Sequence, residues 1–515
     1  MWTEHDRARI LVVSLRMLVL CAVTAGAASL APSAAALSPP AVDVAGIDAV
    51  VQQYRDAANV PGVAVVVTRG AEVVHAAGYG HSPAGDPITE HTPMAVASVS
   101  KSFTALAVLQ LVEAGRVDLG RPVRAYLPEF TLADPRVEAI TVRQLLDQTS
   151  GMSDTTFAAF RRTQPGSLQE AVAGMRTAGL AAEPGTRYSY HNPNFQVAAR
   201  LVEVVSGQPF DDYLRQHVFG PLGMSDSRTG NTERDLPPSA HGHIKILGGP
   251  IAAPEPRAFG NGSGGVLSSA ADMGAWLIAQ NNSGRGPNGA VIASAASIER
   301  SHTPSGVAGS SYALGWDVDT TASGAPLIAH SGDLFTATAY QALLPASGYG
   351  LAVIANTGLA WGDAAALAER LIALLEGAPV PAPPGALSSL GADAVLLLLT
   401  VGTVLLVVRG VLRSGRWATR RARRPLGVVA RLLPLLLPLA LCVSIHRVVG
   451  ALYRGRDVAW IQVPYLYPTF MLLLAIATVG GGAVLLARLV GLARTRGAQE
   501  AVDRTAVDRT AVAGR

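Results

Sequence analysis

A serine and a lysine stand at the start of an otherwise apolar stretch, ASVSKSFTALAVLQLVEAG, residues 97–115. Between residues 103 and 112 only two side chains are polar, which predicts a buried helix. Ser98 and Lys101 are three residues apart, so their side chains should lie on one face of this helix, one turn apart. The spacing therefore lets the hydroxyl and the amine reach a common point.

The position of Lys101 is unfavourable for stability alone. The first turn is the positive end of a helix dipole and disfavours cations, and Lys101 and Lys245 are the only two lysines beside 39 arginines. Apolar surroundings and the helix end should both lower the pKa of this amine. A neutral amine beside a hydroxyl activates a serine as a nucleophile. The structural alternative is an N-cap serine followed by a lysine that reaches solvent.

Two weaker motifs follow later in the chain. Tyr190 and Asn192 flank a histidine in GTRYSYHNPNF, where a phenol can relay a proton and a carboxamide can bind an amide. His330 and Gly332 end an apolar run in LIAHSGDLF. Alone, the first motif also fits a tyrosine packed under a loop with an asparagine in a turn. The second alone also fits a histidine at a strand end followed by a turn glycine. Their order after the Ser98 motif favours one catalytic site.

The elements that must position these residues follow a pattern of strands at both ends and helices between. VAVVVTRGAEVVHAAGYG, residues 63–80, predicts two strands around a turn, and four short β-like runs lie between residues 312 and 356. Residues 101–298 show helical periodicity in several places. This predicts an α+β domain over residues 44–375, with an antiparallel sheet flanked by helices plus a helical subdomain.

Charge is spread unevenly over the 515 residues. Residues 41–390 hold 21 basic and 30 acidic residues, whereas residues 391–515 hold 17 arginines and 5 acidic residues. The globular part is therefore acidic, which argues against nucleic acid as a partner. No cluster of metal ligands stands out, and no cofactor is expected.

The N-terminal segment has the features of an export signal. Three arginines precede an uncharged stretch, and PSAAALS offers a cleavage site of small residues. We therefore predict a signal peptide over residues 1–36, which would place the globular domain outside the cytoplasmic membrane.

The C-terminal part predicts a membrane region over residues 390–490, after a proline-rich linker at 376–389. The expected spans are 390–408, 426–445 and 463–487. The second is the weakest, and an interfacial or re-entrant helix is its alternative. Seven arginines between the first two spans predict a cytoplasmic loop and hence a multi-pass protein with its catalytic domain outside. Residues 491–515 repeat AVDRT and predict a disordered tail on the cytoplasmic side.

Taken together, the motifs resemble the serine β-lactamase and penicillin-binding-protein superfamily, nearest the class C β-lactamase, D-alanyl-D-alanine carboxypeptidase and esterase branch. The segments that carry the resemblance include VPGVAVVVTRG, SVSKSFTALAVLQLVEAGRVDL, ITVRQLLDQTSGM, EPGTRYSYHNPNF, GSGGVLSSAADM, YALGWDV and HSGDLF. The resemblance implies the corresponding β-lactamase/transpeptidase-like fold. It does not extend to the membrane region.

The resemblance also implies a role for each motif. The implied catalytic residues are Ser98, Lys101 and Tyr190, and the implied substrate-binding residues are Asn192, His330, Gly332 and Asp333. Ser98 would be acylated, Lys101 would help to deprotonate it, and Tyr190 would share the base role and protonate the leaving group. Asn192 would hold the substrate amide, and the backbone N–H groups of Ser98 and Asp333 would form the oxyanion hole.

Two departures from the family pattern bear on the substrate. His330 stands where β-lactamases usually have a lysine that holds the substrate carboxylate, and an ordinary histidine is mostly neutral at pH 7. Asp333 stands where relatives often have glycine, and its charge would repel anionic substrates. We therefore do not expect strong β-lactam hydrolysis.

The sequence thus predicts a membrane-anchored extracytoplasmic serine hydrolase that forms an acyl-enzyme on an ester or amide. Esterase and D-Ala-type peptidase activities both remain open. The expected partners are a small acyl or peptide substrate, with cell-wall peptides among the candidates, and membrane lipid. The alternative is a membrane protein that uses the same pocket to sense a ligand or to build a scaffold without turnover.

Overall fold

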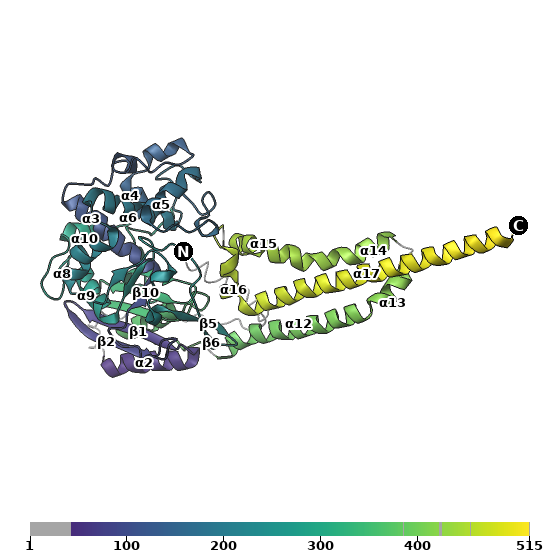
Figure 1. The fold of residues 1–515 in the computed structure, drawn as a ribbon. Coiled ribbons are helices and arrows are strands. Elements are labelled where there is room, and N and C mark those ends of the chain that lie inside the picture. The colour runs from purple at the N-terminus through teal and green to yellow at the C-terminus, as the bar shows by residue number, and fades with distance from the viewer. Residues whose placement is uncertain (1–42, 385, 422–424, 454, 514–515) are drawn as a thin grey trace. The chain divides into compact units, whose positions relative to one another are not determined.

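The computed structural model of the protein describes residues 43–384, 386–421, 425–453 and 455–513 (Figure 1). The predicted signal peptide, residues 1–36, lies outside the described residues. The chain forms two compact units. The first contains the described residues up to Ala386 together with residues 452–466, and the second contains residues 387–451 and those from 467 onward.

The first unit is built on a six-stranded sheet in the order β2-β1-β11-β10-β9-β8, in which the paired strands are antiparallel. Its strands are β1 (Gly62–Arg69), β2 (Glu72–Gly80), β8 (Asp317–Thr320), β9 (Pro326–Asp333), β10 (Thr338–Leu344) and β11 (Tyr349–Ala355). Two smaller sheets contain β3 (Met94–Ala95), β7 (Val266–Ser268) and β4 (Arg228–Thr229), and β5 (Gly242–Ile246) and β6 (Gly249–Ala253). The predicted α+β architecture, with strands from both ends of the domain in one sheet, is confirmed.

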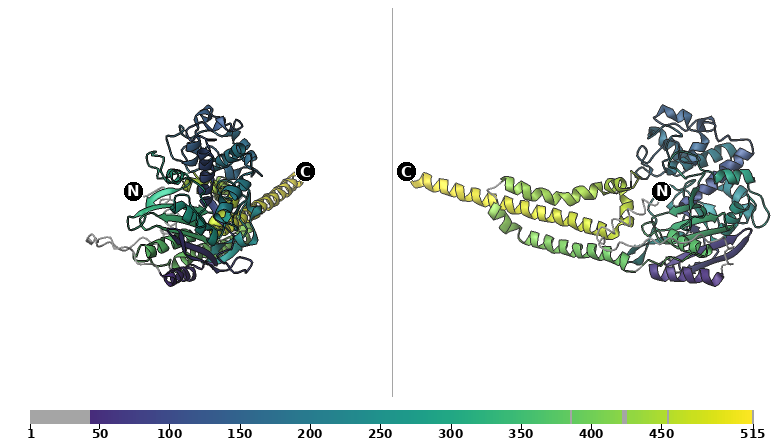
Figure 2. Two further views of the ribbon diagram at one scale, coloured as in Figure 1. Left: turned by 90° about the vertical axis from the view of Figure 1, so that its left-hand side faces the viewer. Right: turned by 180° about the vertical axis from the view of Figure 1, so that it is seen from behind.

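Helices cover both faces of the large sheet. Those of the first unit are α2 (Val44–Ala58), α3 (Ser100–Glu113), α4 (Val142–Leu146), α5 (Leu168–Gly174), α6 (Asn192–Ser206), α7 (Phe210–Leu214), α8 (Gly220–Leu222), α9 (Ala270–Asn281), α10 (Ala295–Ser301), α11 (Asp363–Leu375) and α16 (Val463–Leu466). Helices α2 and α11 share one hydrophobic cluster with the sheet, and α3, α6 and α9 share another. Figure 2 shows α2, coloured purple, running along the sheet.

Strand β1 shows why its sequence is almost continuously apolar. Val63, Val65 and Val67 point into the cluster with α2 and α11, whereas Ala64 and Val66 point into the cluster with α9. Successive side chains of a strand lie on opposite faces, so a strand covered on both faces buries every residue.

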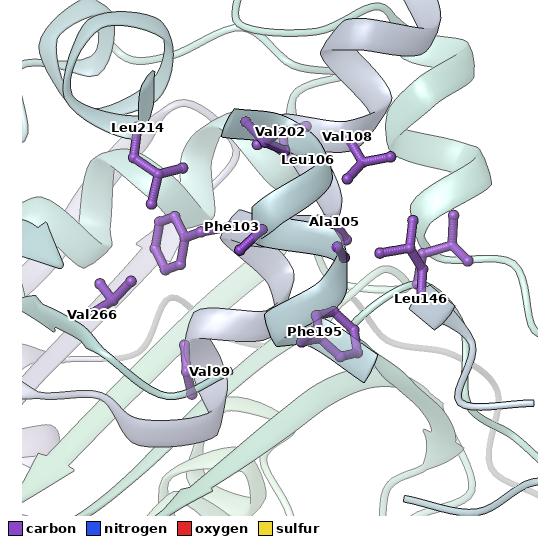
Figure 3. Packing of buried hydrophobic residues seen from close by; sticks show 14 of the residues in the cluster. Val99, Phe103, Ala105, Leu106, Val108, Leu146, Phe195, Val202, Leu214 and Val266 are labelled. Atoms are coloured by element: carbon purple, nitrogen blue, oxygen red, sulfur yellow. The ribbon is translucent and has the colours of Figure 1, made fainter. Parts of the chain in front are cut away.

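Helix α3 lies at the centre of the larger cluster, where Phe103 meets side chains from other helices (Figure 3). The Phe103 ring stacks on Trp276 of α9 with a centroid distance of 4.0 Å and meets Phe219 edge to face at 5.7 Å. Eleven of the fourteen residues of α3 are buried, so this helix has no solvent-facing stripe over most of its length. This packing fixes the turn that precedes α3, where Ser98 lies.

The second unit is helical, and its long apolar helices α12, α15 and α17 run beside one another (Figures 1 and 2), joined by shorter helices. They are α12 (Ala386–Leu412), α13 (Ser414–Arg421), α14 (Pro425–Leu432), α15 (Leu437–Leu452) and α17 (Pro468–Ala513). Within the part of the chain that the structure describes, three segments are long and apolar enough to cross a membrane, namely Leu390–Leu412, Leu426–Leu452 and Pro468–Ala506. Leucines such as Leu398 and Leu406 are about 70% exposed, as expected of side chains that face lipid rather than water.

The second unit contains one break in a predicted span and one difference from the sequence expectations. A 3-10 turn at Leu433–Leu436, which contains Pro434, joins α14 to α15, because proline cannot donate the helical hydrogen bond at that point. Residues 491–513, where we expected a disordered tail, continue α17. Alanine, arginine and glutamate are good helix formers, which accounts for the extension.

We predict that Phe103→Ala lowers the free energy of unfolding of the first unit by about 3–5 kcal/mol, because it opens a cavity in a fully buried aromatic cluster. Denaturant unfolding of the full chain, followed by near-UV circular dichroism, measures this change. The control is Val204→Ala on α6, where the side chain is 40% exposed. Equal unfolding midpoints for the two variants would contradict the central place given to Phe103.

Candidate active site

Ser98 lies in a short 3-10 turn, η1 (Ala97–Val99), that leads directly into α3. We expected it in the first turn of the α-helix itself. Ala97 has a φ of 50°, a left-handed conformation that is costly for a residue with a side chain. The Ser100 hydroxyl donates a hydrogen bond to the Ala97 carbonyl at 2.6 Å and helps to hold this turn. Ser98 therefore stands at a constrained bend, half-buried, at the entry of a rigid helix.

Lys101 is fully buried and its amine lies against Ser98. Nζ is 2.9 Å from Ser98 Oγ, and it donates to the Ser263 carbonyl at 2.6 Å. Burial lowers the pKa of Lys101 well below its usual value, and the nearby positive charge of Arg456 lowers it further, while Asp333 and Asp154 oppose these effects. The expectation of a depressed pKa is thus supported, with burial as its main cause. A neutral amine here can accept the proton of the Ser98 hydroxyl.

Tyr190 is the third group at this point. Its ring centroid lies 4.8 Å from Lys101 Nζ, and the Ser98 hydroxyl is near enough to lower the pKa of the phenol. Burial raises the pKa of Tyr190, and the contact with Ser98 and the charge of Arg456 only partly offset this effect. The phenol is therefore neutral at physiological pH and is suited to pass a proton on rather than to act as the first base.

The segment that carries Tyr190 is held by residues from a distant loop. His191 donates its backbone N–H to the side chain of Gln148 at 3.1 Å, and its ring nitrogen Nδ1 lies 2.7 Å from Asp154 Oδ1. Burial raises the pKa of Asp154, but the Arg456 charge and the bond to His191 outweigh this and lower it to about 2. An ionised Asp154 thus fixes the residue between Tyr190 and Asn192.

Asn192 begins α6 and borders a cavity of about 460 Å³. Its Oδ1 atom is buried and has no hydrogen-bond partner among the described residues. A buried acceptor without a donor is costly, and a substrate N–H could satisfy it. The cavity is also lined by Phe157, Phe160, Arg161, Pro193, Phe259 and Asp457.

Strand β9 brings the third motif to the same place. A Cβ on Gly332 would lie 2.2 Å from the Val96 carbonyl oxygen, so only glycine lets the strand approach the turn of Ser98 this closely. The His330 ring centroid lies 6.3 Å from that of Tyr190. Asp333 ends the strand with an exposed side chain.

His330 is buried and engaged through both ring nitrogens. Nε2 is 3.0 Å from the Tyr312 hydroxyl, and Nδ1 is 2.6 Å from the Ser331 carbonyl oxygen. Since a carbonyl only accepts, Nδ1 carries a proton, and in the neutral ring Nε2 accepts from the Tyr312 hydroxyl. With both nitrogens engaged in this way, the ring is not arranged to bind a substrate carboxylate.

The structure therefore brings together all three motifs that were singled out in the sequence. It adds Ser263, Tyr312, Asp154 and Arg456, which the sequence analysis did not assign to the site. Ser263 lies in GNGSGG, which fits a turn near the pocket, and its backbone carbonyl is the group that contacts Lys101. Among the described residues no group of three potential ligands is placed to hold a metal ion.

Comparisons with known proteins agree on the kind of domain. Residues 47–375 match the Beta-lactamase family. Penicillin-binding protein 4 of Amycolatopsis lactamdurans is 33% identical over 349 residues, which cover 63% of this chain and 89% of the relative. Protein flp of Staphylococcus aureus is 27% identical over 315 residues, or 60% of this chain and 62% of the relative.

Among solved structures, the octameric penicillin-binding protein homologue from Pyrococcus abyssi superposes with a TM-score of 0.57 and 27% identity. The match covers 65% of this chain and 78% of that one. The predicted resemblance to this superfamily is confirmed.

The burial of Lys101 predicts a pH effect on stability. An amine whose folded pKa lies below the unfolded value of 10.5 binds fewer protons in the folded state, so its contribution to stability falls as the pH drops from about 10.5 toward the lowered pKa. Lys101→Met removes this effect. Unfolding free energies measured at pH 7 and pH 10 should therefore show that the variant gains relative to wild type at the lower pH. A pH-independent difference between the two proteins would contradict the depressed pKa.

Proposed function

The chain belongs to the Beta-lactamase family, and from its site we propose that it is an extracytoplasmic, membrane-anchored serine hydrolase that forms an acyl-enzyme on Ser98. The observation that carries this proposal is the 2.9 Å contact between the buried Lys101 amine and the Ser98 hydroxyl. A buried, neutral amine at hydrogen-bond distance is the arrangement that general-base activation of a serine requires.

In the proposed acylation step, Ser98 Oγ attacks the acyl carbon while its proton passes to Lys101 Nζ. The carbonyl oxygen takes up the negative charge and is stabilised by the backbone N–H groups of Ser98 and Asp333. The intermediate then collapses and breaks the bond to the leaving group, which receives a proton through Tyr190. The ammonium of Lys101 returns its proton to Tyr190, so the base is neutral again when water attacks the acyl-enzyme and releases the acid.

The substrate in this proposal is an ester or amide without a carboxylate near the scissile bond. Both ring nitrogens of His330 are already engaged, and the side chain of Asp333 is exposed beside the site. A fixed negative charge with no opposing free cation on this strand disfavours anions. Asn192, with its unpaired buried acceptor, would bind an N–H on the acyl side.

Catalysis is favoured over sensing or scaffolding, which was the alternative from the sequence. A ligand sensor needs a shaped pocket, but it does not need a fully buried lysine whose charged form is destabilised. A buried lysine of this kind lowers the stability of the folded protein. A role in proton transfer would explain why it is present, whereas ligand binding alone would not. The three long apolar helices would hold this hydrolase at the membrane, with the domain on the outer side.

We predict that a fluorophosphonate probe labels the full-length protein at Ser98, as read by mass spectrometry of the labelled peptide. Ser98→Ala should abolish labelling, and Lys101→Met should slow it by about 10²–10⁴-fold, because a positioned base contributes on this scale. Thermal unfolding of each variant serves as the folding control. Labelling at another serine, or equal rates with and without Lys101, would count against the mechanism.

We also predict that Asp333→Asn speeds acylation by an anionic penicillin roughly threefold to tenfold at low ionic strength, because it removes a nearby like charge. The rate with a neutral activated ester should change little, since the backbone N–H at this position is kept. Stopped-flow measurement of both reagents gives the ratio. If the two rates change in parallel, Asp333 does not discriminate by charge.

A further inference from the structure

A short segment that lies between two apolar helices belongs to the hydrolase unit. The stretch 452–466 begins at the last residue of α15 and ends before α17, and its described residues group with the catalytic domain rather than with the helices on either side. They lie about eighty residues beyond the end of the part that matches the Beta-lactamase family, residues 47–375. The family match therefore does not account for this segment.

Asp457 anchors the segment to the catalytic domain. Its side chain is 1% exposed, pairs with Arg161 Nε at 3.1 Å, and accepts a hydrogen bond from the backbone N–H of Phe160. Arg161 also donates to the Val458 carbonyl at 3.1 Å. Buried charges are retained when they are paired and hydrogen-bonded, so these contacts define one position of the segment on the domain.

Arg456 extends from this anchor to the catalytic tyrosine. Its guanidinium carbon lies 4.9 Å from the centroid of the Tyr190 ring, and one terminal nitrogen donates to the Tyr190 carbonyl at 3.3 Å. Nε pairs with Asp154 Oδ2 at 3.2 Å, and the Asp457 backbone N–H donates to the same oxygen at 3.0 Å. Asp154 in turn contacts His191. The segment therefore contacts Tyr190 directly, and it contacts the adjacent His191 through the Asp154 carboxylate.

We propose that residues 452–466 complete the active site and that Arg456 is a positioning residue, which orients Tyr190 and, through Asp154 and His191, the segment that carries Asn192. This inference rests on the proposed function, because it assigns Arg456 a part in the same acylation chemistry. A guanidinium against an aromatic ring is attracted to it. The planar fork of arginine also allows the simultaneous contacts to a carboxylate and a carbonyl.

The charge of Arg456 has a second consequence for the site. Lys101 is near Arg456 and near the carboxylates Asp333 and Asp154, and Tyr190 is near Arg456, Asp317 and Asp333, with the rings of Tyr312 and His330 beside it. Arg456 is thus the cation that opposes several carboxylates. Its removal should raise the pKa of both Lys101 and Tyr190 and leave less neutral amine at a given pH.

The test is the pH dependence of kcat/KM for p-nitrophenyl acetate, a neutral ester, with the full chain in lipid nanodiscs. Arg456→Ala should lower kcat/KM at pH 7 by about threefold to tenfold. It should also move the acidic limb of the profile to higher pH, by about half a pH unit or more. Arg456→Lys should restore the position of the limb because it restores the charge. The matched control is Arg300→Ala, which removes an exposed arginine at the end of α10.

Each outcome of this experiment has a defined meaning. An alanine variant with the rate and the limb of wild type overturns the inference and leaves the proposed function intact. The inference is also overturned if the alanine variant loses rate while the acidic limb of its pH profile stays in place and Arg456→Lys does not restore the rate. That result would mark a merely structural role for Arg456. If the alanine variant unfolds, Arg456→Gln carries the test, since it removes the charge and keeps a hydrogen-bond donor. A wild-type protein that forms no acyl-enzyme at Ser98 would instead remove the proposed function.

Discussion

The structure depends on the burial of one amine beside one hydroxyl. Lys101 is completely removed from solvent, and its nearest polar contacts are the neutral oxygens of Ser98 and Ser263. An ammonium held in this way would lose its hydration without gaining a carboxylate partner. The amine is therefore driven toward its neutral form, which in the proposed mechanism activates the Ser98 hydroxyl.

The surrounding elements keep this unfavourable contact in place. Helix α3 is packed on nearly every side and cannot turn to release the lysine. The turn that carries Ser98 begins at Ala97 in a left-handed conformation, and Gly332 lets strand β9 lie directly against the same turn. Rigid elements from three parts of the chain thus meet at Ser98, the proposed nucleophile, as a preorganised site requires. The segment that carries Arg456 adds a fourth contact from beyond the family domain.

The fold and the reactive pair could be predicted because their signals are local. Short apolar runs separated by turn residues identify the strands, and the spacing of Ser98 and Lys101 places both side chains on one face without knowledge of the rest of the chain. The 3-10 turn at residues 97–99 could not be foreseen, because a positive φ at an alanine has no sequence signature. The helical continuation beyond residue 490 was missed because the repeated, charged sequence was interpreted as a disordered tail. The helix propensity of its residues was given less weight.

The missed site residues share a different cause. Ser263 contacts Lys101 through its backbone carbonyl, 162 residues away in the sequence. Because every residue has a backbone carbonyl, the residue type does not reveal such a contact. Asp154 is an ordinary loop acid until the fold brings it to His191, and Arg456 meets Tyr190 across 266 residues of chain. The sequence analysis assigned neither Arg456 nor Asp457 to the catalytic site. Only the tertiary arrangement places them against Tyr190 and Asp154, the contacts on which their proposed role rests.

The most direct test of this account is the charge of Lys101. The chain contains two lysines, so protein labelled with [6-¹³C]lysine should give two signals in an NMR titration, and Lys101→Met assigns them. Lys245, which pairs with Asp363 at 2.7 Å, provides the internal comparison. The account predicts that the Lys101 signal has the chemical shift of a neutral amine at pH 7–8. A Lys101 signal that remains that of an ammonium ion until the pH exceeds about 10, the usual range for lysine, would contradict it.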